Sequence, residues 1–593
     1  MGTRLTRFTA ALSLSALSLV GCDGSIGAAD HAASGPGSGA SNGASGGAPE
    51  IPGGGAVTGT GIGGTSANPG GGAAGSAPDP NAGSPLLPAR IRRLTDAEFD
   101  ASVNALLGVN STYGQSFTPD TRQDGFSRND AQRVDPVFIG QLQDAAQKLA
   151  ASVQGNIMNL APCSDQRGSE ACAQTFVTSF ATKAYRRPAT DAEVAALMTV
   201  YRAGADTATY VDGIQTVIQA VLESPGFLYV TELGDTPLQD GSKLTQYELA
   251  SSLSFLVTGD PPDDTLIAAA KAGDLADPDK RQAQLDRLLA TSDASTQIVR
   301  LVEQWLGIDA ITETAKDSNT YRDFAELRDS MKKEADDFTT EVMWKNAGGV
   351  SDLLSANWTI ADDKLARMYR SLPIDGNDPV TRNGTHFALD GLNRYGILNQ
   401  GAFLSVYAHA NETAPVLRGV AVLRRLACFN LPSPVNLNVN VVPPLPDPNK
   451  TTRQRFDAHV SDPVCAGCHT NIDSIGFTFE DLDGMGQARV DHKENGLTVD
   501  SSTTVSTGLS FDGNYPDSGA LALALATSPD VLGCFAHHFF RYAATRSDGS
   551  TSGAEDAFTT AALGLGPAAQ GKVHELLSAF VRSDAFVTRR ASE

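Results

Sequence analysis

The chain has 593 residues, a formal net charge of −23 and a sequence pI near 4.8. A protein that binds the phosphate backbone of nucleic acid needs the opposite charge, and no basic cluster is present, so we expect no nucleic-acid partner. The roughly 500 residues that follow position 88 are enough for several domains or for one body with several modules.

The N-terminus has the features of an export signal. Arg4 and Arg7 precede an apolar run from Phe8 to Val20 that is too short to span a bilayer. The stretch Leu-Val-Gly before Cys22 resembles a bacterial lipobox, which predicts a signal peptide over residues 1–21 and lipid on the Cys22 thiol. An ordinary signal peptide that happens to contain a cysteine is the alternative. Lipidation predicts an exported cell-envelope lipoprotein, in the periplasm or outer membrane, whose membrane partner is reached through the lipid anchor.

Residues 22–88 consist almost entirely of Gly, Ser, Ala and Pro after the cysteine. Such a segment has too few apolar side chains to offset the entropy of ordering, so we predict a disordered, flexible tether. Random-coil scaling of about 5–6 Å × √n gives a mean reach of about 45 Å. That reach is enough to hold a folded body away from a membrane surface.

Helical patterns dominate the rest of the chain. Three helix starts carry a capping box, in which a Thr and a Glu three residues later satisfy free backbone N–H groups; these are Thr95 with Glu98, Thr190 with Glu193, and Thr245 with Glu248. Apolar residues at helical spacing predict further helices over 138–153, 210–222, 280–289, 297–306, 324–342, 520–538 and 573–586. Leu497–Phe511 is rich in Thr, Val and Ser and predicts one β-hairpin. The predicted fold class is therefore mainly α.

Four of the seven cysteines are expected to form disulfides. Cys163 and Cys172 flank a short polar loop, and in an oxidising compartment a disulfide is the ordinary outcome for such a pair. Cys428 and Cys534 remain once the other cysteines are assigned, and we expect them to pair with each other.

Cys465, Cys468 and His469 form the stretch CAGCH, for which three kinds of site compete. In covalent haem attachment the two thiols add to the haem vinyl groups, and the histidine becomes the proximal iron ligand. A zinc site needs four ligands, and no second CxxC or HxxxH pair lies nearby. A thioredoxin-like thiol pair follows a strand in a βαβ unit and gives the histidine no role. Export favours one covalent haem c, because c-type haem is attached outside the bacterial cytoplasm.

The residues around CAGCH resemble a bacterial domain family. The shared pattern is His, CxxCH, Asp, Gly-Phe, Glu, Asp, Gly and Arg, carried here by His459, Cys465, Cys468, His469, Asp473, Gly476, Phe477, Glu480, Asp483, Gly486 and Arg489. The family is a string of domains of unknown function, numbered 1587, 1595, 1592, 1588 and 1585, in planctomycete and myxobacterial proteins. Its members are often described as cytochrome-like. No reaction is assigned to the family, so the resemblance leaves open whether this chain is an enzyme.

The resemblance extends over nearly the whole folded body. It rests on the segments Arg93–Phe99, Ala184–Pro188, Tyr247–Ser251, Arg394–Leu398 and Ser583–Phe586. It implies helical modules at 89–155 (1587-like), 160–232 (1595-like), 240–372 (1592-like), 390–492 (1588-like, with the haem motif) and 510–593 (1585-like).

Three residues are candidates for the second axial ligand of the haem iron. Met485 suits an electron-transfer cytochrome, because Met/His ligation raises the reduction potential. His409 lies in a stretch that resembles the family and has the reach to approach from another segment. His459 matches the family pattern but precedes Cys465 by only six residues, which favours a supporting role on the proximal side. A packing role competes at each position.

Three functions follow from these observations. The first is a mono-haem c-type redox protein that exchanges electrons with an unidentified donor or acceptor. The second is a haem-dependent oxidoreductase that acts on an extracellular substrate such as polysaccharide. The third is a non-redox, glycan-binding or scaffolding lipoprotein, in which CAGCH holds a disulfide and Trp305, Trp344 and Trp358 bind sugar, although core packing competes for each tryptophan.

Overall fold

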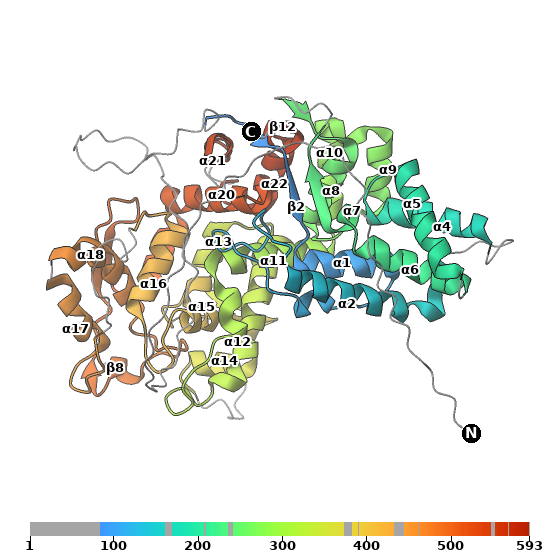
Figure 1. Cartoon of the computed structure of the whole chain (residues 1–593). Helices are drawn as coiled ribbons and strands as arrows, with labels where there is room; N and C mark the ends of the chain where they lie inside the picture. Colours follow the sequence, from blue (N-terminus) through green and yellow to red (C-terminus); the bar gives the residue numbers. More distant parts are fainter. Residues whose placement is uncertain are drawn as a thin grey trace, which may run out of the picture. The chain divides into compact units, whose positions relative to one another are not determined.

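The computed structural model describes residues 83–160, 169–206, 209–234, 241–372, 382–389, 391–431, 444–461, 463–546, 552–566 and 569–591. These residues are mainly α-helical, as the sequence predicts, and short strands join distant parts of the chain (Figure 1). The predicted signal peptide, Cys22 and nearly all of the predicted tether lie outside the described residues. All of the described residues belong to one contact unit, Pro52–Glu593.

The first two predicted modules share a single hydrophobic core. The helices that build it are α1 (Asp96–Leu107), α2 (Pro136–Ser152), α4 (Glu170–Ala184), α5 (Asp191–Ala205) and α6 (Tyr210–Leu222). The rings of Phe117 and Phe227 meet the ring of Phe99 edge-on, at centroid distances of 5.0 and 5.8 Å. Because Phe227 comes from the second module, residues 89–155 and 160–232 bury their apolar faces against each other.

A second, larger core joins the other three predicted modules. Its main helices are α8 (Gln246–Val257), α11 (Ser292–Leu306), α12 (Phe324–Thr339), α15 (Gly401–Val406), α16 (Pro415–Ala421), α20 (Pro529–Ala544) and α22 (Val573–Arg582). Trp305 is fully buried there: its ring lies 4.7 Å from that of Phe535, and its Nε1 donates to the carbonyl of Arg425 at 2.6 Å. Residues from all three modules therefore meet around one indole.

The other α-helices of the described residues pack around these two cores. They are α3 (Ile157–Leu160), α7 (Pro225–Leu228), α9 (Asp264–Ala272), α10 (Pro278–Leu289), α13 (Val350–Ser355), α14 (Asp363–Tyr369), α17 (Thr452–Phe456), α18 (Pro463–Phe477), α19 (Ser518–Ala526), α21 (Ser552–Leu563) and α23 (Asp584–Val587). The capping boxes predicted at Thr95, Thr190 and Thr245 are all present at the starts of their helices. Each satisfies backbone N–H groups that a helix start leaves unpaired.

Short strands tie the two ends of the described chain together. β1 (Leu87–Pro88) runs parallel to β12 (Thr588–Arg590), which pairs antiparallel with β4 (Ser242–Lys243). β2 (Arg90–Arg93) pairs antiparallel with β3 (Tyr229–Glu232), and β7 (His386–Ala388) pairs with both β5 (Trp358–Thr359) and β6 (Arg382–Asn383). Strands of two to four residues are too short to show an alternating pattern, so the sequence did not predict them.

A buried ion triad joins these strands. The carboxylate of Glu232 accepts hydrogen bonds from Arg90 at 2.9 Å and from Arg589 at 2.7 Å, and all three side chains are buried. Burial alone raises the pKa of Glu232, but the two guanidinium groups outweigh it and hold that pKa well below its usual range. The charged form of Glu232 thus connects residues that are 142 and 357 positions away in the sequence.

Four of the sequence predictions are wrong in detail. Leu497–Phe511 does not form one hairpin: β9 (Leu497–Thr498) pairs back with β8 (Lys493–Glu494), and β10 (Thr503–Val505) pairs forward with β11 (Gly513–Tyr515). Asn495 and Gly496, both at positive φ, make the tight turn between β8 and β9. This Asn-Gly turn signal lies just outside the range that the prediction considered.

The helix predicted over 520–538 is instead two helices, α19 and α20, bent by 71°. Pro529 opens α20, where its missing N–H is not needed, and Ser528 caps that helix by accepting from the N–H of Val531. Among the described residues, no single helix is long and apolar enough to cross a membrane. The bent pair α19 and α20, taken together, has the length and composition of a membrane span. The helix predicted over 573–586 is also two helices, α22 and α23, because a new helix starts after Ser583. The helix predicted over 324–342 is α-helical only to Thr339 and continues as a π-helical turn from Thr340.

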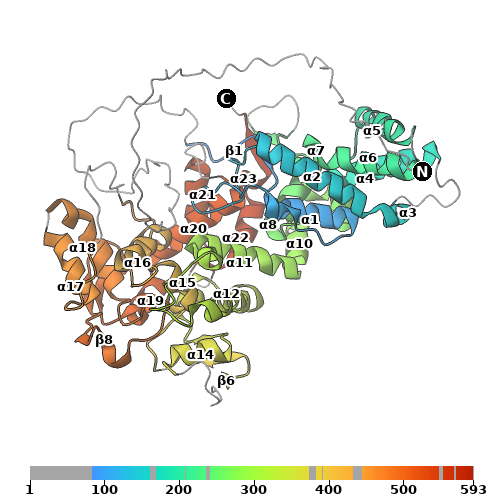
Figure 2. The same cartoon turned by 60° about the horizontal axis from the view of Figure 1, so that its bottom comes forward.

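The helix that carries CAGCH, α18, is held by a backbone contact with α16. Both views place these helices side by side (Figures 1 and 2). A Cβ atom at Gly419 would lie 2.0 Å from the carbonyl oxygen of Ile472, and one at Gly476 would lie 2.0 Å from that of Pro415. No side chain larger than hydrogen fits at either point, so two glycines fix the distance between the helices.

We predict that Gly476→Ala destabilises the protein because its methyl group would collide with the Pro415 carbonyl. Overpacking of this kind lowers the free energy of unfolding by about 1–3 kcal/mol. Gly467→Ala, on the same helix but with no atom within 4 Å of the new methyl group, is the matched control and should raise stability by about 0.5–1 kcal/mol. Urea denaturation followed by circular dichroism measures both changes. Equal stabilities of the two variants would contradict the backbone contact.

Candidate functional site

α18 presents the whole CAGCH motif on one face. Cys465, Cys468 and His469 stand at helical positions i, i+3 and i+4, and all three are half-buried. Both cysteines are free thiols. Side chains three residues apart on a helix have Cβ atoms about 5–6 Å apart, whereas a disulfide needs about 3.5–4.5 Å. The helix therefore disfavours the disulfide on which the non-redox hypothesis depends.

A buried carboxylate orients the imidazole of the motif. Nδ1 of His469 lies 2.9 Å from Oδ1 of Asp473, one helical turn further on, and Asp473 is only 2 % exposed. A carboxylate accepts but does not donate, so Nδ1 carries the proton and the lone pair of the neutral ring is on Nε2. The second carboxylate oxygen of Asp473 is buried without a hydrogen-bond partner, which leaves its negative charge directed at His469. The sequence pattern contains Asp473 but gave it no role.

These side chains fit haem attachment better than the two alternatives. Two free thiols and an oriented imidazole share one half-exposed face, and the intervening Gly467 has open space beside it. In the described part of the chain, the group of His, Cys, Asp or Glu side chains close enough to hold an ion lies elsewhere, so CAGCH lacks a four-ligand zinc set. A 3-10 turn, η9 (Asp457–Ser461), and not a strand, precedes α18, so the thioredoxin-like context is missing as well.

Arg418, together with Glu480 and Arg489 of the family pattern, holds the loop that follows α18. Arg418, on α16, is fully buried and donates to the carbonyls of Leu404, Phe479, Leu482 and Asp483 at 2.8–3.3 Å. The buried carboxylate of Glu480 lies 3.9 Å from Arg418 and 3.6 Å from Arg489. Burial raises the pKa of Glu480 and lowers that of Arg418, and each charge offsets part of the other's burial cost.

The three candidate axial ligands differ in their surroundings. Met485 is 4 % exposed and packs into the larger hydrophobic core. His409 is half-buried, and burial lowers its pKa, so its imidazole is neutral and suited to binding a metal. Lys316 holds this segment by donating to the carbonyls of Ala408 and His409. The backbone of His459 lies in η9, directly before α18, and its side chain lies outside the described residues.

The remaining predicted sites have separate locations. The disulfide predicted between Cys428 and Cys534 is present. Cys172 is disulfide-bonded, and its predicted partner Cys163 lies outside the described residues. Of the tryptophans, Trp305 is a core residue, and Nε1 of Trp344 donates to the carbonyl of Leu289.

Trp358 stacks on His386 at 4.1 Å, half-buried, and packs against Phe338. One face of its ring is therefore already covered by His386, which disfavours the sugar-platform role.

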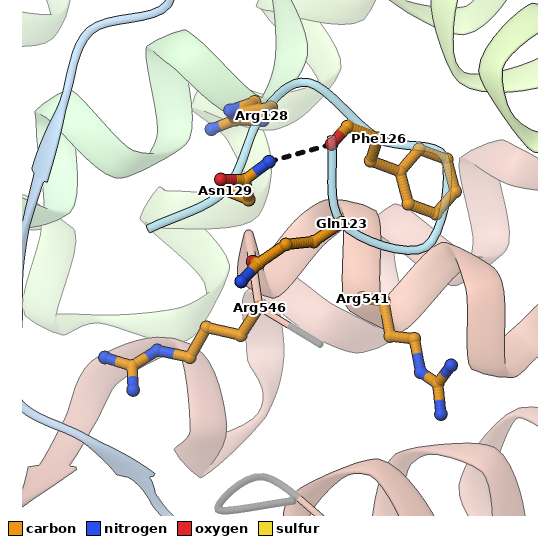
Figure 3. Close-up of a pocket in the computed structure, with 6 residues that line it drawn as sticks. All are labelled: Gln123, Phe126, Arg128, Asn129, Arg541 and Arg546. Carbon is orange, nitrogen blue, oxygen red and sulfur yellow. Dashed lines mark hydrogen bonds between the residues drawn. The ribbon is translucent and has the colours of Figure 1, made fainter. Parts of the chain in front are cut away.

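An arginine-lined pocket lies between residues 123–129 and the C-terminal end of α20 (Figure 3). Burial lowers the pKa of Arg128 to about 10 and that of Arg546 to about 9. Figure 3 shows the guanidinium groups of Arg541 and Arg546 pointing away from each other. Arg541 pairs with Asp124 and Arg546 donates to the carbonyl of Pro88, each across a long sequence separation. The pocket therefore joins two segments and does not gather reactive groups around a substrate.

Comparison with protein families finds four matching models. They are PSD3, a protein of unknown function (DUF1587), at residues 92–155; PSD5 (DUF1595) at 172–232; PSD4 (DUF1592) at 244–370; and PSCyt3 (DUF1588) at 394–492. The last of these contains CAGCH and bears a name that suggests a cytochrome-like module. No curated protein and no solved structure matches the chain. The 1585-like module at 510–593 stays a prediction.

We predict that Arg418→Met disrupts the loop after α18. The substitution leaves four carbonyls without their donor and Glu480 without one of its two cationic neighbours, which should lower the free energy of unfolding by about 3–5 kcal/mol. Arg424→Met is the matched control, because Arg424 is exposed on the turn after α16. Hydrogen exchange over residues 478–489 and urea denaturation measure the effect. Similar protection in both variants would show that Arg418 does not anchor this loop.

Proposed function

The chain belongs to the multi-module, cytochrome-like bacterial family of unknown function whose domains are numbered 1587, 1595, 1592 and 1588, and from this premise we propose that it is an exported mono-haem c-type redox protein. In this proposal Cys465 and Cys468 bind haem through thioethers, and His469 is the proximal iron ligand. The haem supplies a reversible one-electron iron couple, which suits electron transfer at the cell envelope.

The observation that carries the proposal is the shared face of α18. Both thiols are free and stand one helical turn apart, and the histidine next to the second thiol projects from the same face. A metal-binding histidine almost always donates its other ring N–H to a carboxylate, carbonyl or water, and His469 donates to Asp473. A helix with only a packing role needs neither a free thiol pair nor a carboxylate committed to an imidazole.

Asp473 has a defined physical role in this proposal. It holds the His469 ring in one tautomer and orientation, in which Nε2 is the nitrogen that would bind iron. Its buried negative charge also makes the imidazole a stronger electron donor, which stabilises the oxidised state of the iron and lowers its reduction potential.

His409 is the better supported candidate for the opposite axial position. It is half-buried and neutral, and the adjacent Glu412 is bound by Arg455 of α17 at 2.6 Å, which places its loop against the segment that leads into α18. Met485 already fills space in the hydrophobic core, where leaving would open a cavity.

We also propose that the N-terminal segment exports the protein and anchors it through lipid on Cys22. The support is the basic start, the short apolar run and the lipobox-like ending in residues 1–22. Haem c attachment outside the cytoplasm is consistent with this location.

Haem attachment is tested by mass spectrometry of protein produced with c-type maturation machinery. The tryptic peptide from Phe456 to Arg489 should carry one haem in the wild type, and the pyridine haemochrome spectrum should be of the c type. Replacing Cys465 or Cys468 with Ala should remove one covalent link, and replacing both should make the haem extractable by acidified solvent. Recovery of the wild-type peptide without haem, with both thiols free or joined, would overturn the proposal.

We predict that Asp473→Asn raises the reduction potential of the haem, because the amide removes the charge that strengthens the His469 ligand. Asp481→Asn removes an equal charge from the same module, but Asp481 is bonded to Ser501 and not to His469, so it controls for simple loss of charge. Spectroelectrochemical titration measures both potentials. If the two shifts are equal, the His469–Asp473 hydrogen bond does not tune the haem.

A further inference from the structure

A histidine without hydrogen-bond partners lies against the Cys428–Cys534 disulfide. The two sulfur atoms and a ring nitrogen of His538 all lie within 4.8 Å of one another. Cys534 and His538 are four residues apart on α20 and therefore share one face of that helix. Cys428 reaches them from the opposite side, after the π-helical turn η7 (Val422–Leu426), with its backbone at a φ of 48°.

The His538 ring is buried and uncommitted. The residue is 8 % exposed, and neither of its ring nitrogens has a hydrogen-bond partner. The backbone of Arg424 lies close by, but outside hydrogen-bond geometry. Burial, with smaller contributions from Arg541 and Arg425, lowers the pKa of His538 to about 3, so the ring is a neutral, potential metal ligand. Its neighbour His537 instead bonds Glu555 at 3.1 Å.

We propose that reduction of the Cys428–Cys534 disulfide creates a binding site for a thiophilic closed-shell cation, Zn²⁺ or Cu⁺, with Cys428, Cys534 and His538 as its ligands. Two thiolates and an imidazole are the donors that these ions prefer. At a Zn–S distance of about 2.3 Å and a Zn–N distance of about 2.0–2.1 Å, the donor atoms of one tetrahedral ion lie about 3.6–3.8 Å apart. The three side chains already meet within 4.8 Å, so opening the S–S bond is the main movement needed.

The reduction step requires a dithiol reductant, and the exposure of the two cysteine residues defines its direction. Cys428 is exposed, whereas Cys534 is 2 % exposed. A thiolate of the dithiol attacks Sγ of Cys428, the S–S bond breaks, and Cys534 leaves as the thiolate. The second thiol of the reductant then displaces Cys428 and forms the reductant's own disulfide. Two electrons pass to the protein, and metal binding releases the two thiol protons to solvent.

The charged side chains near His538 are compatible with the net charge of a metal bound by two thiolates. Two thiolates with Zn²⁺ are neutral overall, and two thiolates with Cu⁺ carry one negative charge. Arg425 and Arg541 lie near enough to act on His538 electrostatically and so to compensate that charge. Three protein ligands leave one coordination position open, as in zinc sites that bind a further molecule.

The proposal is tested on the mature, full-length protein by zinc binding before and after reduction with a phosphine that is then removed. Zinc retained against a competing chelator is counted by elemental mass spectrometry, and X-ray absorption at the zinc edge identifies its ligands. Reduced wild type should hold one more zinc per chain than oxidised wild type, with two sulfur ligands and at least one nitrogen ligand. Reduced Cys534→Ser should lose that zinc, which separates it from any zinc at CAGCH.

The two histidines on α20 provide the matched pair of variants. His538→Gln should weaken zinc binding at least about tenfold, whereas His537→Gln should leave it unchanged. No additional zinc in reduced wild type, equal zinc in Cys534→Ser, or equal affinity in His538→Gln would overturn the proposal. So would loss of the helical circular dichroism of the wild type on reduction, because the site requires an intact α20.

Discussion

The backbone contact between α16 and α18 is the constraint on which the candidate site depends. Gly419 meets the carbonyl of Ile472, and Gly476 meets that of Pro415, so the two helices cannot separate or rotate without losing a contact that only glycine permits. From this contact α18 continues toward its N-terminus with Cys465, Cys468 and His469 on one face. Arg418 lies beside Gly419 and fixes the loop that leaves the other end of α18. Packing at one end of the helix therefore determines which face the motif shows at the other.

Several residues of the family pattern have structural roles in the fold. Glu480 and Arg489 pair with buried partners, and Gly486 offers its carbonyl to the fully buried Arg394. A buried guanidinium costs a large desolvation energy unless its donors are satisfied, so removing one partner of such a pair is destabilising. The triad of Arg90, Glu232 and Arg589 uses the same principle to join the chain ends. Cys465, Cys468, His469 and Asp473 of the same pattern lie instead on α18, where Asp473 contacts the imidazole of His469.

The helices could be predicted because capping boxes and apolar spacing are visible in short stretches of sequence. Contacts between distant segments leave no comparable pattern in the sequence. The capping boxes at Thr95, Thr190 and Thr245 are properties of four consecutive residues and could be identified in the sequence. The bend before Pro529 was missed because apolar spacing continued through it. The larger core and the pairing of β12 with β1 and β4 depend on segments hundreds of residues apart. The motif CAGCH was evident from spacing alone, but the orientation of His469 by Asp473 required the helix, and the position of His538 beside Cys534 and Cys428 required the fold.

One helical segment links the two sulfur-containing sites. α16 contacts α18 at Gly419 and continues through η7 to Leu426, about 10 Å further along at a helical rise of 1.5 Å per residue. Two residues later Cys428 ties the same segment to α20 through the disulfide. Trp305 and Arg425 brace its end, since the indole donates to the Arg425 carbonyl and the guanidinium donates to the carbonyl of Trp305. One continuous helical segment therefore contacts the CAGCH helix at Gly419 and leads to the disulfide-bonded Cys428 just beyond its other end.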